Sequence, residues 1–387
     1  MQPLTTAEMF PRSKKIESEL KTRISKKGKI TFKEFMEVVL YLPEFGYYTN
    51  PDREPWRDFF TSPDIHPVFS RMMAKQLADM YACLGSPKRF LAVEMGAGKG
   101  LMAFEILRYS KTRYPAFHKA LTYVIIEPNA LNESRQRSLF AEHDLGVVLW
   151  FQALERLPFT EMEGCILSNE LLDSYPVNRV TMSGGKFSEI YVAVERDRFV
   201  ERLGTPSTVK LQRYFEELGF FPSRGTVAEV NLNSLQWIRT VASIIKRGFV
   251  LTIDYGLEAR RLFARSAGTF LCYHNHAVTF NPYIRLGYQD MTSHVDFTSL
   301  SRAGEKNKLR TLALITQAEF LRNLGIDETL QSVQISSSEH RKLLRAIREL
   351  TNPRGLGGHK VLIQSKNIAN PRLACLAESR KQSHSIV

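Results

Sequence analysis

The sequence predicts an α/β fold, in which a mostly parallel β-sheet is joined by crossover helices and interrupted by inserted segments. Three observations predict it. Short apolar runs alternate with helical stretches from residue 90 onward, a glycine-rich turn follows the first run, and 43% of the 387 residues are hydrophobic against 24% charged. This composition supports a large folded core and argues against wholesale disorder. The length allows two or three lobes of about 150 residues each.

Two short helices precede the sheet. Residues 16–26 and 31–41 carry apolar side chains at helical spacing, and Pro43 and Gly46 end the second stretch. A proline-rich loop follows over 47–67, and helical periodicity resumes near residue 65. We therefore assign residues 1–85 to an N-terminal helical cap and a loop that is too rich in special residues to be a plain linker.

Seven strands are expected in the domain that follows, over residues 86–366. The first five are apolar runs separated by helical stretches, which is typical of parallel strands with crossover helices. Helices over 317–324 and 339–350 separate the last two strands. The seven runs are 90–94, 122–127, 147–151, 164–168, 249–254, 309–315 and 360–364.

Two insertions interrupt this alternation. Residues 176–225 begin with two runs flanking Gly184 and Gly185, which predicts a hairpin inserted in the sheet. Residues 256–305 are rich in His, Asn, Tyr and Gly and have little period, so they are expected to form a long functional loop. Residues 367–387 are expected to form a charged, flexible tail.

Charge and cysteine content limit the function classes. Lys and Arg number 53 and Asp and Glu 40, a net charge of +13 that favours anionic partners. The four cysteines lie far apart without a CxxC pair, which indicates neither a disulfide framework nor a thiolate zinc site. His274 and His276 lack a marked third ligand, so no metal site is predicted.

The chain shows no run of about 18 apolar residues and no secretory h-region, so we expect no membrane insertion and a cytoplasmic location. The basic start resembles an organellar transit peptide, but acids such as Glu17 and Glu19 interrupt it.

The strongest motif is Glu94-Met95-Gly96-Ala97-Gly98-Lys99-Gly100 at the end of an apolar run. A phosphate-binding loop of NTPases would need glycine at Val93 and a hydroxyl at Gly100, and a dinucleotide fingerprint would need its third glycine at Leu101. Glu followed by GxGxG resembles motif I of class I methyltransferases, in which the turn binds S-adenosyl-L-methionine. This assigns Glu94, Gly96, Gly98 and Gly100 to the cofactor.

Two later strand ends complete the expected cofactor site. Glu127 closes the second run, and a carboxylate there would accept hydrogen bonds from both ribose hydroxyls. Gln152 follows Trp150 and Phe151, where aromatic rings would flank an adenine and the amide would meet its amine. The alternative is that these aromatics belong to the core edge.

The fourth run ends at Asn169-Glu170-Leu171-Leu172-Asp173, and open α/β sheets bind ligands at this edge. Glu170 and Asp173 are three residues apart, so on a helical turn they would share a face and could clamp a planar guanidinium, while Asn169 orients it. The alternative is a helix cap.

Together these residues resemble the MidA family of S-adenosylmethionine-dependent methyltransferases over nearly the whole chain. The matching strings include Asp58-Phe59-Phe60-Thr61-Ser62-Pro63, the glycine turn, and the segment from Asn169 to Asp173. Further matches lie at 35–36, 40–48, 253–256, 268–269, 294–297, 316–317 and 320–321.

The resemblance implies a Rossmann-like, seven-stranded class I methyltransferase sheet, S-adenosyl-L-methionine as cofactor, and methylation of a protein arginine. In mitochondrial members that arginine belongs to a core subunit of respiratory complex I, and a eukaryotic source would imply the mitochondrial matrix. A homodimer is left open.

Substrate-side residues also follow from the resemblance. The family's Asp-Phe-x-Thr-Ser-Pro loop covers the cofactor site, which here assigns Asp58, Thr61, Ser62 and Pro63 to substrate binding. His294 and Asp296 would orient the substrate, or Asp296 would cap the helix beginning near Phe297. The chain departs from the family at Arg57 and Ser70, where glycine is usual, and at Gln152, where aspartate is frequent.

Two alternative functions stay open. One is methylation of nucleic acid, suggested by the positive charge, although no Pro-Pro-aromatic string follows Asn169 and the basic N-terminal run is typical of a solvated helix face. The other is an assembly or scaffolding protein that keeps the fold without turnover.

Overall fold

The structure is a computed structural model that describes residues 12–51, 58–332, 334 and 337–376. The chain forms two compact units, each built from three stretches of sequence. Unit 1 comprises residues 1–60, 172–236 and 256–300, and unit 2 comprises 61–171, 237–255 and 301–387. The predicted N-terminal cap is thus divided at residue 60, and most of both predicted insertions belongs to unit 1.

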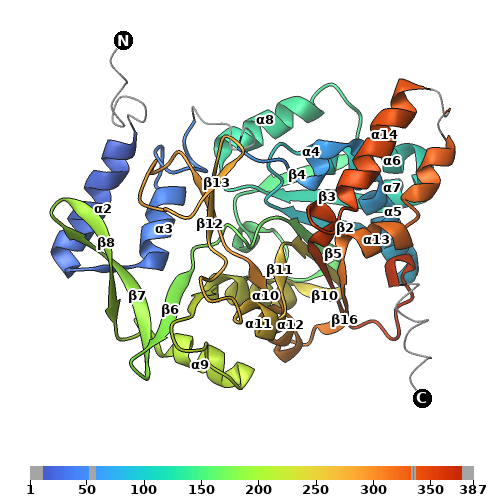
Figure 1. Ribbon diagram of the computed structural model, residues 1–387. Helices are drawn as coiled ribbons and strands as arrows, with labels where there is room; N and C mark the ends of the chain where they lie inside the picture. Colours follow the sequence, from blue (N-terminus) through green and yellow to red (C-terminus); the bar gives the residue numbers. More distant parts are fainter. Residues whose placement is uncertain (1–11, 52–57, 333, 335–336, 377–387) are drawn as a thin grey trace, which may run out of the picture. The chain divides into compact units, whose positions relative to one another are not determined.

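Unit 2 contains the seven-stranded sheet (Figure 1). Its order is β16-β17-β10-β5-β2-β3-β4, and only β17 runs antiparallel to its neighbours. This confirms the mostly parallel sheet, and the strand order reverses between β5 and β2. The strands are β2 (Phe90–Met95), β3 (Leu121–Ile126), β4 (Val147–Phe151), β5 (Met162–Asn169), β10 (Ile245–Asp254), β16 (Arg310–Thr316) and β17 (Lys360–Lys366).

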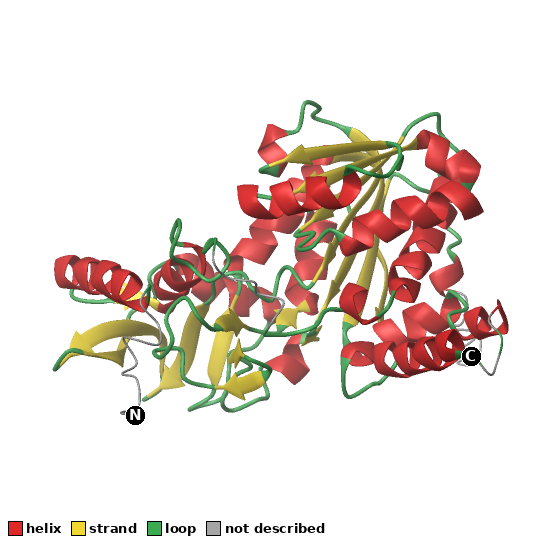
Figure 2. Ribbon diagram, turned by 90° about the horizontal axis from the view of Figure 1, so that it is seen from above, coloured by secondary structure: helices red, strands yellow, loops and turns green. Residues whose placement is uncertain are grey.

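Helices cover both faces of this sheet, as Figure 2 shows. Helix α5 (Pro67–Cys83) starts two residues later than predicted, because His66 accepts a hydrogen bond from the Val68 amide and Pro67 fills the first turn. The remaining helices are α4 (Ser62–Ile65), α6 (Leu101–Arg113), α7 (Pro115–Ala120), α8 (Ala130–Phe140), α13 (Gln317–Asn323) and α14 (Ser338–Leu350), while α10 (Leu232–Ile244) and α12 (Phe297–Lys306) include residues of both units.

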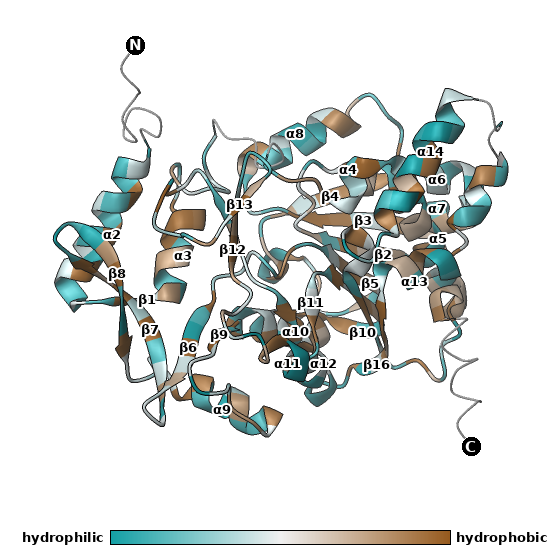
Figure 3. Ribbon diagram, viewed as in Figure 1, coloured by the Kyte–Doolittle hydropathy of each residue, from teal (hydrophilic) through white to brown (hydrophobic). Residues whose placement is uncertain are grey.

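Helix α14 shows how its sequence selects one buried face. Leu343, Ala346, Ile347 and Leu350 recur at helical spacing and are buried. The rest of the helix is hydrophilic, and Figure 3 shows it largely teal. The helix therefore packs through one apolar stripe and leaves its charged face exposed.

Two glycines let the central strands approach one another. Gly164 of β5 pairs with Leu91 of β2 on one side and with Gly248 of β10 on the other. A Cβ on Gly164 would lie 2.0 Å from the Leu91 carbonyl oxygen, and φ is +146°. Any residue with a Cβ would collide with the neighbouring strand at this position of the sheet, so glycine is required.

Unit 1 contains a separate five-stranded sheet. The predicted hairpin is present as β6 and β7, with Gly184 and Gly185 at φ 56° and 78° in its two-residue turn. Its placement in the main sheet was wrong, because it pairs with other strands of unit 1. The five strands are β1 (Ile30–Thr31), β6 (Asn178–Ser183), β7 (Lys186–Glu195), β8 (Arg198–Gly204) and β9 (Val227–Val230).

The second insertion contains short elements where a loop was expected. Its strands have only two to four residues, too few for a periodic pattern to be visible in the sequence. They are β11 (Gly256–Leu257), β12 (Leu271–His274), β13 (Ala277–Thr279), β14 (Asp290–Thr292) and β15 (Val295–Asp296), accompanied by α11 (Ala259–Leu262), with α9 (Val209–Leu218) in the other insertion.

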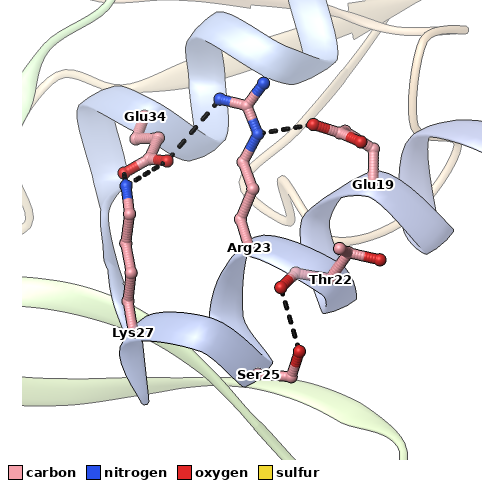
Figure 4. A network of polar contacts seen from close by, with 6 residues as sticks. All are labelled: Glu19, Thr22, Arg23, Ser25, Lys27 and Glu34. Carbon is pink, nitrogen blue, oxygen red and sulfur yellow. Dashed lines mark hydrogen bonds and ion pairs between the residues drawn. The ribbon is translucent and has the colours of Figure 1, made fainter.

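The two predicted N-terminal helices are confirmed as α2 (Ser13–Lys27) and α3 (Phe32–Tyr41). Their basic side chains pair with acids of the same unit (Figure 4). Arg23 lies 2.7 Å from Glu19 and 3.5 Å from Glu34, which also accepts a hydrogen bond from Lys27. This pairing supports the interpretation of the basic run as a solvated helix face.

The C-terminal segment differs from the predicted flexible tail up to residue 376. Leu373 and Cys375 are buried, the Ala374 amide donates to Asp79 of α5, and Asn323 of α13 donates to the Cys375 carbonyl. The tail prediction for residues 377–387 lies outside the described residues. In the part of the chain that the structure describes, no helix has both the length and the apolar character needed to cross a membrane.

Candidate active site

The glycine turn follows β2 and precedes α6. Gly96, Gly98 and Gly100 all adopt positive φ, at 73°, 53° and 78°. A Cβ built on Gly98 meets no heavy atom within 4 Å, whereas one on Gly96 would lie 2.9 Å from a Leu171 side-chain carbon. The turn thus needs glycines for its conformation and leaves open space over Gly98, as a backbone cradle for a ligand requires.

Two buried carboxylates lie at the ends of the strands beside this turn. Glu94 of β2 accepts a hydrogen bond from the Tyr123 hydroxyl at 2.6 Å, and burial raises its pKa to about 7. Glu127 follows β3 and accepts from the Asn129 amide at 2.9 Å, and burial raises its pKa also to about 7. Glu127 is therefore positioned after β3, as the sequence predicted for a ribose-binding acid.

Gln136 of α8 connects these parts, although no sequence motif marks this residue. Its side-chain amide is fully buried and donates to the Gly98 carbonyl at 2.8 Å and to Glu127 Oε2 at 3.2 Å. Its oxygen accepts from the Trp150 indole at 3.0 Å. One amide thereby fixes the glycine turn, the acid after β3 and the end of β4.

The end of β4 differs in part from the expected adenine site. The Trp150 ring packs against Phe140 edge-on and lies 4.4 Å from the Arg137 guanidinium, which supports the alternative of a core-edge aromatic. Gln152 follows the strand and is exposed. Its role toward the cofactor stays a prediction.

Asn169 and Glu170 lie where β5 ends. The segment after Asn169 is not helical, so the shared helical face predicted for Glu170 and Asp173 was wrong. Glu170 adopts φ 50°, a conformation that costs a non-glycine residue about 1 kcal/mol or more, and its amide donates to the Ile253 carbonyl. Its Oε1 accepts from Asn169 Nδ2 at 3.2 Å and from the Ser62 amide at 3.4 Å.

The loop before α5 is bound locally to the glycine turn. Thr61 and Asp64 form a reciprocal capping box around α4, and Asp64 lies 2.7 Å from Lys99 of the turn. The Ser62 hydroxyl donates to Gln317, and Pro63 fills the first turn of α4. These contacts position Thr61, Ser62 and Pro63 beside the turn, while their predicted substrate contacts stay a prediction.

Asp58, Asp173, His294 and Asp296 belong to unit 1. Asp58 accepts from the Tyr47 hydroxyl and the Asn275 amide, both at 2.7 Å. The Asp173 carbonyl accepts from the Ser293 amide at 3.0 Å, next to β14.

Both oxygens of Asp296 accept hydrogen bonds within unit 1. Oδ1 accepts from the Thr298 and Ser299 amides, and Oδ2 from the Tyr214 hydroxyl. This is the geometry of the capping alternative. His294 is half-buried, and loss of solvent around it lowers its pKa to about 4, so its imidazole is neutral at physiological pH.

The residues present fit a bound S-adenosyl-L-methionine. The space over Gly98 suits a ligand that approaches the backbone, and Asn169 Oδ1 is buried with no hydrogen-bond partner in the described ranges. With the sheet order and the acid after β3, this site defines a class I S-adenosyl-L-methionine-dependent methyltransferase.

Comparison with known proteins agrees with this class. The family model described as an S-adenosyl-L-methionine-dependent methyltransferase matches residues 72–315, and the chain belongs to this family. A crystal structure of a Burkholderia thailandensis protein bound to S-adenosyl-homocysteine superposes with a TM-score of 0.86 at 27% identity, covering 97% of this chain and 98% of that one. These matches confirm the family resemblance inferred from the sequence. They also confirm S-adenosyl-L-methionine as the cofactor.

Curated relatives cover most of the chain as well. The mitochondrial protein arginine methyltransferase NDUFAF7 of Homo sapiens is 26% identical over 87% of this chain and 79% of its own length. Its homolog in Drosophila melanogaster is 24% identical over 88% of this chain and 82% of its own.

Proposed function

We propose that the methyl acceptor is an arginine side chain of a protein. Two observations support this. The similar curated proteins are named protein arginine methyltransferases, and Glu170 supplies a carboxylate directly after β5. A guanidinium is the planar cation that carboxylates bind best. For a eukaryotic source, the expected substrate is a respiratory complex subunit in the mitochondrial matrix.

For methyl transfer, the main contribution of the protein is to position the acceptor nitrogen against the methyl group. S-adenosyl-L-methionine, when bound, supplies a methyl group on a positively charged sulfur. The attacking arginine nitrogen forms a bond to the methyl carbon as the carbon–sulfur bond breaks, and the nitrogen loses one proton. Glu170 would orient this nitrogen and accept the proton, and Asn169 holds Glu170 through its side-chain amide.

The test is transfer of label from methyl-tritiated S-adenosyl-L-methionine into a lysate of the source organism. Wild-type protein should label a protease-sensitive band whose acid hydrolysate contains methylarginine. Glu170→Gln should lower turnover by about 100-fold, because the general base is lost, while S-adenosyl-homocysteine affinity stays within about threefold. Glu142→Gln changes an exposed acid of unit 2 and should behave as wild type.

Other outcomes contradict the proposal. Label on lysine would exclude the arginine acceptor, and label confined to nuclease-sensitive material would support nucleic-acid methylation. A complete absence of label would support the scaffold alternative.

A further inference from the structure

A buried polar pair adjoins Glu170 within unit 2, and the proposed chemistry does not use it. Ser62 is the first residue of α4 and Gln317 the first residue of α13, 255 residues apart in the sequence. Both residues are 0% exposed. Burying a hydroxyl and an amide costs free energy unless each finds a hydrogen-bond partner, so their partners define what the pair can do.

Three hydrogen bonds fix Gln317. Its backbone amide donates to the His359 carbonyl at 2.8 Å, and its side-chain Nε2 donates to the Leu350 carbonyl at 3.1 Å. Because Nε2 faces a carbonyl, the amide oxygen faces Ser62, and the Ser62 hydroxyl is the donor in their 3.0 Å hydrogen bond. The end of α14 and the residue before β17 therefore determine where Gln317 holds Ser62.

The backbone of Ser62 connects this pair to Glu170. The Ser62 amide donates to Glu170 Oε1 at 3.4 Å, and Asn169 Nδ2 donates to the same oxygen at 3.2 Å. Two N–H donors on one oxygen restrict the orientation of the carboxylate and favour its negatively charged form. The 3.4 Å contact is at the long end of the hydrogen-bond range, so a further shift of α4 by about 0.3 Å would break it.

Asp64 anchors α4 by a second, weaker contact. Its Oδ1 lies 2.7 Å from Lys99 Nζ, but the Lys99 side chain is 30% exposed, so solvent screens this ion pair. The hydrogen bond between Ser62 and Gln317 is fully buried and is not screened. The buried pair is therefore the stronger determinant of the position of α4.

We infer that Gln317 is a positioning residue of the active site, which holds Ser62 where its amide keeps Glu170 in the orientation that accepts the proton of the arginine nitrogen. This inference rests on the proposed function, in which Glu170 is the general base, and adds no step to the reaction. Gln317 lies in one of the strings that match the family, at 316–317, for which the sequence alone indicates no role.

The test measures the initial rate of label transfer from saturating methyl-tritiated S-adenosyl-L-methionine into the protease-sensitive band of the lysate, between pH 6 and 9. Gln317→Leu removes the acceptor of the Ser62 hydroxyl and should lower the rate at pH 7 by about tenfold. The acid limb of its pH profile should move to higher pH by about half a unit or more, because a carboxylate that loses an N–H donor holds its proton more tightly.

A second variant and a matched control separate positioning from folding. Ser62→Ala breaks the same hydrogen bond from its other end with little change in volume, so it should reproduce both effects. The double variant should be no slower than the slower single variant, because the two changes remove one shared contact. Gln331→Leu makes the same substitution at an exposed glutamine of unit 2 and should behave as wild type. Each variant should bind S-adenosyl-homocysteine within about threefold of wild type, which shows that the cofactor site is folded.

Folded Gln317→Leu and Ser62→Ala variants with the wild-type rate and pH profile would overturn the inference. A lower rate with an unchanged pH profile also overturns it, because that result marks a merely structural role. In both cases methylarginine in the wild-type product and loss of turnover in Glu170→Gln leave the proposed function standing. Label on lysine, or full activity of Glu170→Gln, removes the proposed function itself.

Discussion

Glu127 carries its carboxyl in a buried position, so its protonation depends on its surroundings. Burial raises the pKa to about 7, and the hydrogen bonds from Asn129 and Gln136 oppose this rise. The ionised form accepts hydrogen bonds through both oxygens, whereas the protonated form loses part of that capacity. Cofactor affinity should therefore depend on pH near neutrality.

We predict that S-adenosyl-homocysteine binds more tightly as pH rises from about 5.5 to about 7.5. Below the pKa of Glu127, the dissociation constant of S-adenosyl-homocysteine should rise by up to about tenfold for each unit by which the pH falls. The reason is that the Glu127 carboxyl must then lose a proton before the ligand binds. Calorimetry at several pH values checks this. Glu127→Gln should bind more weakly and without this slope, and a flat profile for wild type would contradict the role of Glu127.

Among single residues, the sequence predicted those that belong to a recognisable motif. The three glycines, Glu94 and Glu127 lie at strand ends, where motif and position agree. Gln136 was missed, because its role depends on a partner distant in sequence: it bonds to Gly98, which is 38 residues away.

Strand spacing in the main sheet depends on Gly164. We predict that Gly164→Ala lowers the free energy of unfolding by roughly 3 kcal/mol, because a Cβ would collide with the backbone of β2 and the positive φ disfavours alanine. Thermal or urea unfolding measures this. Gly85→Ala is the matched control, since Gly85 also has a positive φ, at 81°, but its Cβ would meet no heavy atom within 4 Å. Equal stability of the two variants would contradict the prediction.

The sequence predicted the main strands well and the insertions poorly, for one physical reason. Parallel strands buried on both faces appear as continuous apolar runs, such as β3, in which every residue is buried. Strands of two to four residues, such as β11 or β13, carry no readable period. The hairpin β6–β7 was detected from its glycines, but local sequence does not encode which sheet a hairpin joins.

Each unit has its own hydrophobic core. One cluster, which includes Phe90, Leu251 and Ile363, lies within unit 2, and separate clusters around Phe35 and around Phe215 lie within unit 1. Separate cores allow separate unfolding transitions, so a single midpoint need not describe the chain.

We predict that S-adenosyl-homocysteine selectively stabilises unit 2, by about 2.7 kcal/mol at a hundred times its dissociation constant. The chain has three tryptophans, of which Trp150 and Trp237 belong to unit 2. When the third is replaced, in a Trp56→Phe variant, tryptophan fluorescence reports on unit 2. Calorimetry should show two unfolding transitions. S-adenosyl-homocysteine should raise the midpoint of the transition that coincides with the change in tryptophan fluorescence and leave the other midpoint unchanged. A single transition that shifts as a whole would contradict this.

The Gln136 amide also offers a way to sort related sequences. Its nitrogen donates twice and its oxygen accepts once, and no carboxylate or aliphatic side chain reproduces this pattern. A relative with leucine or glutamate at this position would lose the brace between turn and acid, even with all three glycines in place. Such a relative is a candidate for a family member that keeps the fold but no longer binds S-adenosyl-L-methionine.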